Sequence, residues 1–201
     1  MAEEVWASGA VEGPTDESVL RRLATQVGLG ITAVYGKNGK DQLRKHIKAY
    51  NRAALFSNWI VLVDLDHEAE CAPPMRADWV LRPAPLLCFR IAVRQIEAWL
   101  LADRERMARY LRVPVSQIPT DPESLANAKD AMVALARRSR RSDIREDMVP
   151  RPGSGRPSGP AYSSRLIEYT REHWRPDIAA HTSDSLRRCL ARLQEIVAGT
   201  T

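Results

Sequence analysis

Two short apolar segments of this chain each end in acidic residues, and this pattern restricts the fold more than any other feature. The first segment runs from Val5 to Val11 and is followed by Glu12. The second runs from Trp59 to Val63 and is followed by Asp64-Leu65-Asp66. Short apolar runs rich in β-branched residues are typical of strands buried on both faces, as in a parallel sheet. The sequence therefore predicts an α/β fold with carboxylates at the ends of parallel strands.

The segments around these two strands alternate between helix and strand patterns. We expect a helix capped by Thr15 or Asp16 and ending near Val27. Further strands are expected over 31–35 and 86–93, and further helices over 41–55 and 94–111. This order is expected of a mostly parallel sheet with right-handed crossovers. The second half of the sequence predicts helices over 124–138, 164–174 and 183–197. A loop rich in Pro and Gly is predicted over 150–160.

The length of 201 residues suits one globular unit of ordinary size. We expect a core over residues 1–105 and a helical C-terminal extension over 106–201 that packs on it. No apolar stretch reaches the roughly 20 residues of a membrane span, so no membrane association is expected. The start, Met1 to Glu4, is acidic and unlike a signal peptide. The protein is therefore expected in the cytoplasm, where a homo-oligomer is compatible with the sequence.

The strand-end acids are the first candidates for a functional site. In an open α/β sheet, ligands bind beyond the carboxyl ends of the strands, so Glu12, Asp64 and Asp66 are expected to meet there. Asp64 and Asp66 are two residues apart and point to the same side of an extended chain. Crowded carboxylates repel one another unless a hard divalent cation neutralises them. Asp16 either joins this set or serves as a helix N-terminal residue.

Three further side chains have two interpretations each. On a helix, Arg94 and Glu97 are neighbours and would form a surface ion pair. Alternatively, Glu97 is a partly buried acid directed at the edge of the sheet. Lys40 lies with Lys37 in a loop between glycines, which either cradles a phosphate or is simply solvated. This loop lacks the spacing of a P-loop.

Positive charge is concentrated in the second half of the chain. The first 100 residues hold 12 basic and 12 acidic side chains, so the net charge of +5 comes from residues 101–201. Arginine suits bidentate phosphate contacts, although a coding bias toward arginine would give the same composition. The densest run supplies four candidate phosphate ligands: Arg137, Arg138, Arg140 and Arg141. Lys40 and Arg94 are the other candidates for neutralising the phosphate of a substrate.

Several motifs together resemble a family of small bacterial Toprim-like proteins, catalogued as a domain of unknown function and related to the OLD-type nucleases. The motifs are Val11-Glu12-Gly13-Pro14-Thr15-Asp16-Glu17, Val61-Leu62-Val63-Asp64-Leu65-Asp66 and the segment from Arg90 to Asp103 that contains Glu97-Ala98-Trp99. Gly159-Pro160-Ala161-Tyr162 and Ser183 to Leu190 are also similar to that group.

The resemblance implies a Toprim-like, Rossmannoid three-layer sandwich with a Mg²⁺ site, for which Mn²⁺ could substitute. Glu12, Asp64 and Asp66 match the metal-binding acids, Asp16 matches the extra acid of OLD-like members, and Glu97 matches the subgroup's own acid. A third acid after the Asp-x-Asp pair is out of register here, which leaves the number of metal ions open.

Two functions from different classes are compatible with these features. The first is a Mg²⁺-dependent nuclease that hydrolyses DNA or RNA phosphodiesters, with Glu12, Asp64, Asp66 and Glu97 as catalytic acids. The resemblance adds a role in antiphage or anti-plasmid defence and an ABC/SMC-type ATPase partner, which would be a separate subunit because this chain has no Walker motif. The second is a non-catalytic adaptor or effector module that docks on an ATPase or a phage protein.

Overall fold

The computed structural model describes residues 4–199 and contains a four-stranded parallel sheet. The strands are β1 (Trp6–Val11), β2 (Gly30–Gly36), β3 (Asn58–Asp64) and β4 (Leu87–Ala92). Their order across the sheet is β2-β1-β3-β4, and every neighbouring pair is parallel. The predicted α/β class with a parallel central sheet is therefore confirmed.

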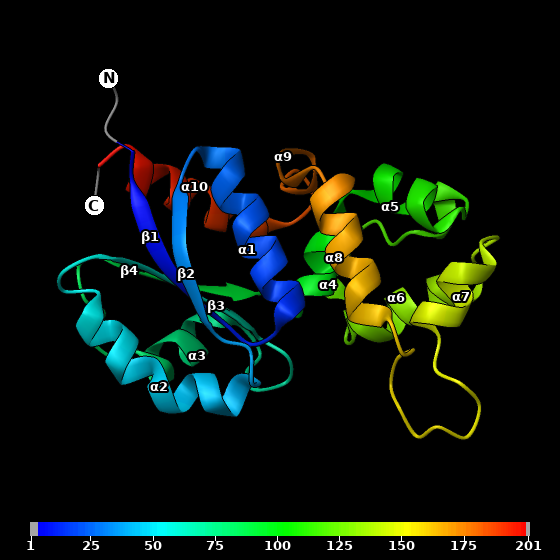
Figure 1. Ribbon diagram of the computed structural model, residues 1–201, viewed down its shortest axis with the longest axis horizontal. Helices are drawn as coiled ribbons and strands as arrows, with labels where there is room; N and C mark the ends of the chain where they lie inside the picture. The colour runs from blue at the N-terminus through cyan, green and yellow to red at the C-terminus, as the bar shows by residue number, and fades with distance from the viewer. Residues whose placement is uncertain (1–3, 200–201) are drawn as a thin grey trace.

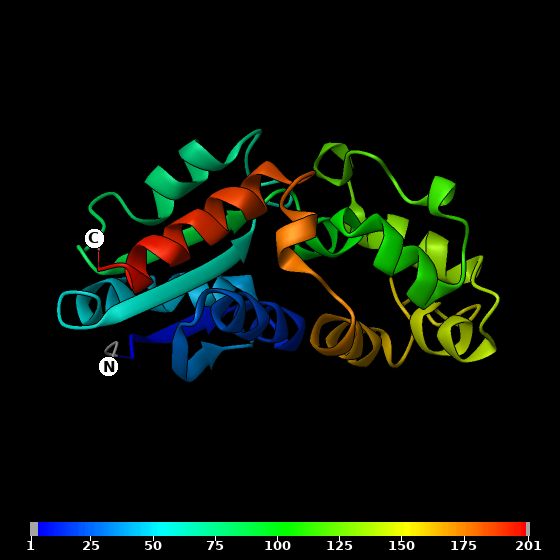
Figure 2. The same cartoon turned by 90° about the horizontal axis from the view of Figure 1, so that it is seen from above.

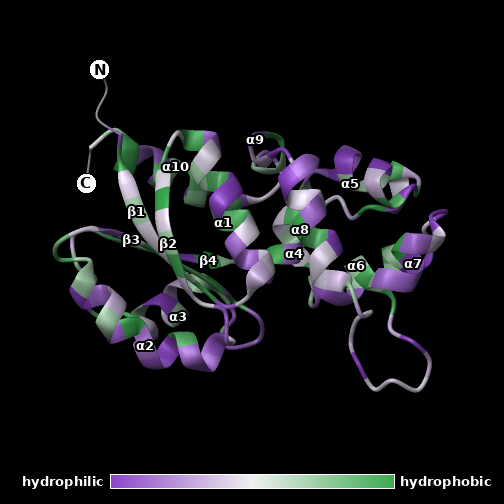
Figure 3. Cartoon of the chain, in the orientation of Figure 1, coloured by the Kyte–Doolittle hydropathy of each residue, from purple (hydrophilic) through white to green (hydrophobic). Residues whose placement is uncertain are grey.

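Helices cover both faces of the sheet (Figures 1 and 2). One face packs against α1 (Pro14–Val27) and α10 (Asp184–Val197), and the other packs against α2 (Lys40–Ala53) and α3 (Ala72–Trp79). The fold is thus a Rossmann-like three-layer sandwich. Figure 3 shows hydrophobic and hydrophilic turns on the same helices, as expected of helices with one buried face.

The central strand β3 is covered on both faces, which explains why its residues 59–63 are all apolar. Ile60 and Leu62 belong to the core on the side of α1 and α10, whereas Val61 and Val63 belong to the core on the side of α2 and α3. Successive side chains of a strand point to opposite faces, so a strand covered on both sides needs no polar alternation.

The chain after β4 is mostly helical and extends to one side of the sheet before α10 returns to it (Figure 1). The helices of this part are α4 (Ile96–Ala102), α5 (Arg104–Leu111), α6 (Ala128–Arg137), α7 (Ser142–Met148), α8 (Tyr162–Glu172) and α9 (Pro176–Ala179). Two 3₁₀ turns, η1 (Val115–Gln117) and η2 (Pro122–Ser124), lie between α5 and α6. No helix within residues 4–199 has both the length and the apolar character that crossing a bilayer requires.

Some predicted helix boundaries were wrong. The single helix expected over 94–111 is two helices, because Asp103 leaves the helical conformation and its side chain caps α5 by accepting a hydrogen bond from Arg106 N. The N-cap of α1 is Gly13 and neither Thr15 nor Asp16, and the Asp16 carboxylate interacts with the main chain of Gly13 and of Asp16 itself. The short helices α7 and α9 were not predicted, whereas the loop over 150–160 was.

Candidate functional site

The site begins at the carboxyl edge of the sheet, where β1 and β3 end side by side. Glu12 directly follows β1, and Asp64 is the last residue of β3. In the parallel register Val11 lies opposite Leu62, so Glu12 comes next to the end of β3. Its Oε1 atom accepts a hydrogen bond of 2.7 Å from the main-chain N–H of Asp64. The Glu12 carboxylate is therefore in contact with the main chain of Asp64, a residue 52 positions further along the sequence.

Asp16 and Glu97 lie beside this pair, in the first turns of α1 and α4, and each is only 7% exposed. The Asp64 Oδ1 atom accepts a hydrogen bond of 2.9 Å from the main-chain N–H of Ile96, which ties the start of α4 to the end of β3. The Glu97 Oε1 atom accepts a hydrogen bond of 3.0 Å from the Tyr162 hydroxyl. We call the four acids the carboxylate cluster: Glu12, Asp16, Asp64 and Glu97.

The electrostatics of the carboxylate cluster are dominated by burial. Burial raises the pKa of Glu12 to about 7. Burial and the negative charge of Glu12 raise the pKa of Asp16 to about 7. Burial raises the pKa of Asp64 well above its ordinary value, assisted by the charges of Asp16 and Glu97, and it also raises the pKa of Glu97. Desolvated acids that repel one another are typical of functional sites.

Asp66 lies at the rim of the cluster and has partners of its own. Its φ of 49° is in the left-handed region, so the chain turns after β3, and Asp64 and Asp66 are not the extended pair that we expected. The Asp66 Oδ2 atom is 2.6 Å from Lys40 Nζ, and Oδ1 accepts a hydrogen bond of 3.1 Å from Gln95 Nε2. Lys40 also lies 3.2 Å from Glu68.

Lys40 therefore serves as a counter-ion to the acids after β3. Burial lowers the pKa of Lys40, but the hydrogen bond to Asp66 and the neighbouring carboxylates outweigh that effect, so its pKa is raised overall. Because its charge is already paired, contact between Lys40 and a substrate phosphate requires the Asp66 ion pair to open.

Arg94 holds the loop after β3. It precedes α4, so the expectation that Arg94 and Glu97 are neighbours on one helix was wrong. The Arg94 guanidinium donates to the carbonyl of Asp66 at 3.0 Å and lies 3.5 Å from that of Ala69. The main-chain N–H of Asp66 donates to the Arg94 carbonyl at 2.8 Å. The side chain thus positions the loop that carries Asp66.

The arginines proposed for phosphate contacts lie between α6 and α7. Arg137, Arg138 and Arg140 are exposed at the end of α6 and in the turn after it. Arg141 forms an ion pair with Asp143 and lies over the ring of Tyr110, with 5.5 Å from its Cζ atom to the ring centroid. The contacts of Arg141 are thus with the helical part of the chain and not with the carboxylate cluster.

Three residues next to the cluster were not predicted: Gln95, Lys129 and Tyr162. The Gln95 Oε1 atom accepts a hydrogen bond of 3.1 Å from Lys129 N, and Lys129 Nζ lies 5.3 Å from the centroid of the Tyr162 ring. The charge of Lys129 lowers the pKa of Glu97, against the larger effect of burial. Two weak signals were present in the sequence: Tyr162 belongs to one of the motifs, and Lys129 is the one lysine after residue 100.

The donor chemistry of the cluster fits a hard divalent cation, which prefers carboxylate oxygens. One oxygen each of Glu12 and Asp64 accepts a main-chain hydrogen bond, and no hydrogen bond to the second oxygen is found within residues 4–199. The carboxylate oxygens of the cluster nevertheless lie farther apart than those of a preformed metal site. Its oxygens would have to close around an ion, or the ion would retain several waters, as Mg²⁺ usually does.

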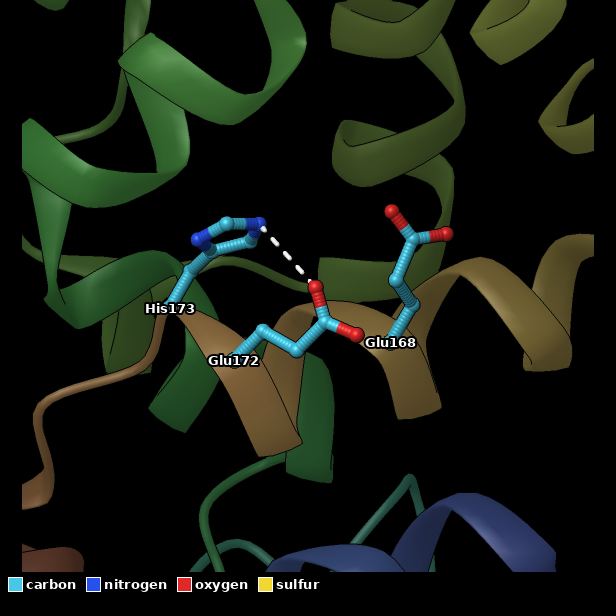
Figure 4. Close-up of side chains that lie close together, drawn as sticks. All are labelled: Glu168, Glu172 and His173. Carbon is cyan, nitrogen blue, oxygen red and sulfur yellow. Dashed lines mark ion pairs between the residues drawn. The ribbon is translucent and has the colours of Figure 1, made fainter.

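The carboxylate cluster does not bring three ligand atoms within 4.8 Å of one another; within the described residues one group does, and it consists of Glu168, Glu172 and His173 (Figure 4). His173 Nε2 lies 3.9 Å from the Glu172 carboxylate, and Glu168 is paired with Arg165 at 2.9 Å. Figure 4 shows His173 and Glu172 directed at each other, with the Glu168 carboxylate turned away. The Glu172 side chain is 64% exposed, so this group is an ordinary surface arrangement.

Comparison with protein-family models, with curated proteins and with solved structures finds no match for this chain.

Proposed function

We propose that this chain is a Mg²⁺-dependent phosphodiesterase of nuclease type that acts on nucleic acid. The observation that carries the proposal is the carboxylate cluster, whose four acids come from the ends of β1 and β3 and the starts of α1 and α4. Buried carboxylates with raised pKa values cost stability unless a cation or a chemical role compensates. Their position at the carboxyl ends of parallel strands supports a ligand site.

Glu12, Asp16, Asp64 and Asp66 would hold the metal ion, with Mn²⁺ as a substitute for Mg²⁺. When bound, the ion supplies positive charge for the phosphoryl oxygens and lowers the pKa of a coordinated water. Glu97 is suited to accept a proton, because burial raises its pKa and Tyr162 fixes the orientation of its carboxylate.

Asp64→Asn is the most direct test of the nuclease. The substitution removes the negative charge but retains the side-chain size and an oxygen that accepts the hydrogen bond from Ile96 N. We expect the rate of cleavage of labelled DNA or RNA oligonucleotides, with Mg²⁺ or Mn²⁺ present, to fall by about 100-fold or more.

Glu70→Gln provides the matched control, since Glu70 is an exposed acid in the loop that follows the same strand. Its activity should stay within about two-fold of the wild type, because surface charges contribute little. Full activity of the Asp64→Asn protein, with an unchanged melting temperature, would exclude the carboxylate cluster as the catalytic site.

A non-catalytic adaptor is the second candidate, and the ion pairs of Lys40 favour it. Lys40 already neutralises part of the acidic loop by contacting Asp66 and Glu68. In that case the cluster would have little affinity for a cation. Calorimetric titration with Mg²⁺ separates the candidates: binding at or below millimolar concentration supports the nuclease, and no heat of binding supports the adaptor.

The resemblance to OLD-type nucleases extends the proposal to a biological role in defence against phages or plasmids. It also suggests an ABC-type ATPase as a separate partner. The cleavage assay should therefore be repeated with the products of neighbouring genes added, with and without ATP.

A further inference from the structure

An arginine-lined pocket of about 240 Å³ lies between α5, the turn after α6 and the end of α8. The helices α5 and α8, which with their C-cap residues carry most of its lining residues, lie in the helical part of the chain, apart from the sheet (Figure 1). Its lining residues are Arg106, Arg109, Tyr110, Arg112, Arg141 and His173. We call it the arginine pocket.

Three of the arginines come from one helix and follow its periodicity. Arg106 and Arg109 lie on α5, and Arg112 is its C-cap residue. Residues three apart in a helix are neighbours on its surface, so three positive charges are placed in one row. Like charges in this arrangement destabilise a helix unless anions compensate them.

The acids of this region pair with arginines other than the three of the row on α5. Glu105 is the one acid of α5, and it pairs with Arg175 at 3.2 Å. Asp143 and Glu168 each lie 2.9 Å from Arg165. Within residues 4–199, no ion pair of 4.0 Å or less is formed by the three arginines of the row: Arg106, Arg109 and Arg112.

The floor of the pocket is held in place without a ligand. Tyr110 is buried, its hydroxyl donates a hydrogen bond of 3.0 Å to the carbonyl of Arg165, and its ring centroid is 5.4 Å from that of His173. The Arg141 guanidinium lies over the Tyr110 ring and is paired with Asp143. A fixed floor reduces the entropy that a ligand must lose on binding.

We infer that the arginine pocket binds phosphate groups of a nucleic-acid backbone and anchors the substrate away from the carboxylate cluster. Guanidinium groups bind phosphate oxygens in a bidentate manner, and the unpaired row supplies three of them. The volume is below the several hundred cubic ångströms typical of pockets for whole drug-sized ligands, so it suits one or two phosphates. The identity of the ligand as nucleic acid rests on the proposed function.

This inference changes the assignment of the basic residues. The run after α6 was predicted to contact phosphate, but only Arg141 of that run lines the pocket. The row on α5 was not predicted, because its arginines are interspersed with apolar residues that face the core.

The test is binding of a labelled single-stranded oligonucleotide by fluorescence anisotropy, with EDTA present so that no cleavage occurs. Arg109 and Arg112 are exposed, so the double variant Arg109→Gln/Arg112→Gln should fold normally. We expect its Kd to rise by about ten-fold or more. The slope of log Kd against log salt concentration should also decrease by about 1.4, the change expected for the loss of two phosphate contacts on a single strand.

The matched control is Arg187→Gln/Arg188→Gln, which removes the same charge from the exposed surface of α10. Its Kd should change by less than about three-fold. Equal weakening in both double variants would overturn the inference, because binding would then depend only on net charge. Absence of binding by the wild type would overturn it as well.

Sodium tripolyphosphate distinguishes a free polyphosphate from a backbone phosphate. We expect it to compete only weakly with the oligonucleotide, and binding of tripolyphosphate more tightly than the oligonucleotide would overturn nucleic acid as the ligand. Because these measurements contain no metal, their outcome is independent of whether the Asp64→Asn variant retains cleavage.

Discussion

The buried and partly buried acids of the carboxylate cluster lower the stability of the folded protein when they are ionised. Glu12 and Asp16 both have a pKa of about 7 in the folded protein, against about 4 in an unfolded chain. Between about pH 4 and pH 7 the folded state therefore binds more protons than the unfolded state, so the free energy of unfolding falls as the pH rises. Without a cation, the protein should be less stable at pH 8 than at pH 5.5.

Asp16→Asn should relieve part of this cost. The uncharged side chain has no carboxylate to desolvate, so at pH 8 the metal-free variant should be more stable than the wild type by about 1–2 kcal/mol. The loss of stability between pH 5.5 and pH 8 should also be smaller in the variant. Thermal melts in EDTA at both pH values measure the two effects.

Addition of Mg²⁺ at pH 8 is the companion measurement. A cation held by the cluster should raise the melting temperature of the wild type more than that of Asp16→Asn. Melting temperatures of the wild type that do not change with pH would contradict the raised pKa values of Glu12 and Asp16.

At the scale of elements, the break between α4 and α5 is held by a buried carboxylate. Asp103 is fully buried and accepts hydrogen bonds from Arg175 N at 3.1 Å, Nε at 3.0 Å and Nη2 at 2.7 Å. It also caps α5. One side chain thus sets the angle between two helices and fastens them to the segment before α9.

Asp103→Ala should therefore be strongly destabilising. It leaves Arg175 without its main partner and α5 without its cap, at a cost of about 2–4 kcal/mol. Urea denaturation measures the loss. Asp184→Ala, which removes an exposed acid paired with Arg187 and Arg188, should cost less than about 1 kcal/mol. Similar costs for both variants would show that burial of Asp103 contributes nothing.

At the scale of the whole molecule, the sheet and the C-terminal helices share one core. Val11 of β1 and Leu20 of α1 belong to the same buried cluster as Leu166 and Tyr169 of α8. Helix α1 packs against α8, and α10 packs against both α1 and β4. The face of the sheet that α1 covers is thus completed by residues after position 160.

A fragment of residues 1–105 should not fold independently, because removal of α8 and α10 exposes the apolar face of α1. The full chain should unfold in one cooperative transition, whereas the fragment should show none. Calorimetry and circular dichroism compare the two directly. A cooperative melt of the fragment would show instead that the sheet and the C-terminal helices are separate domains.

Much of the fold could be predicted because it depends on local patterns. An apolar stretch of five to seven residues predicts a strand covered on both faces, and the apolar residues of β3 form such a stretch. Acids placed directly after such strands necessarily lie near the carboxyl edge of the sheet. The meeting of Glu12 with Asp64 followed from this geometry alone, once the two strands were taken as parallel neighbours.

Other features depend on contacts that no local pattern encodes. Tyr162 reaches Glu97 across 65 residues, and Lys40 reaches Asp66 across 26, because helices that are distant in sequence pack beside the same strand ends. The turn at Asp66 and the break at Asp103 likewise depend on partners supplied by Arg94 and Arg175.

Sequence alone was sufficient for the parallel α/β class and for the acids at its carboxyl edge, because side-chain periodicity is a local property and the alternation of strands with helices favours parallel pairing. Which of those acids are buried, which are already neutralised, and which arginines stand without an acidic partner emerged only from the folded chain. The physical reason is that desolvation and ion pairing are set by every neighbour in space, and most of those neighbours are remote in sequence.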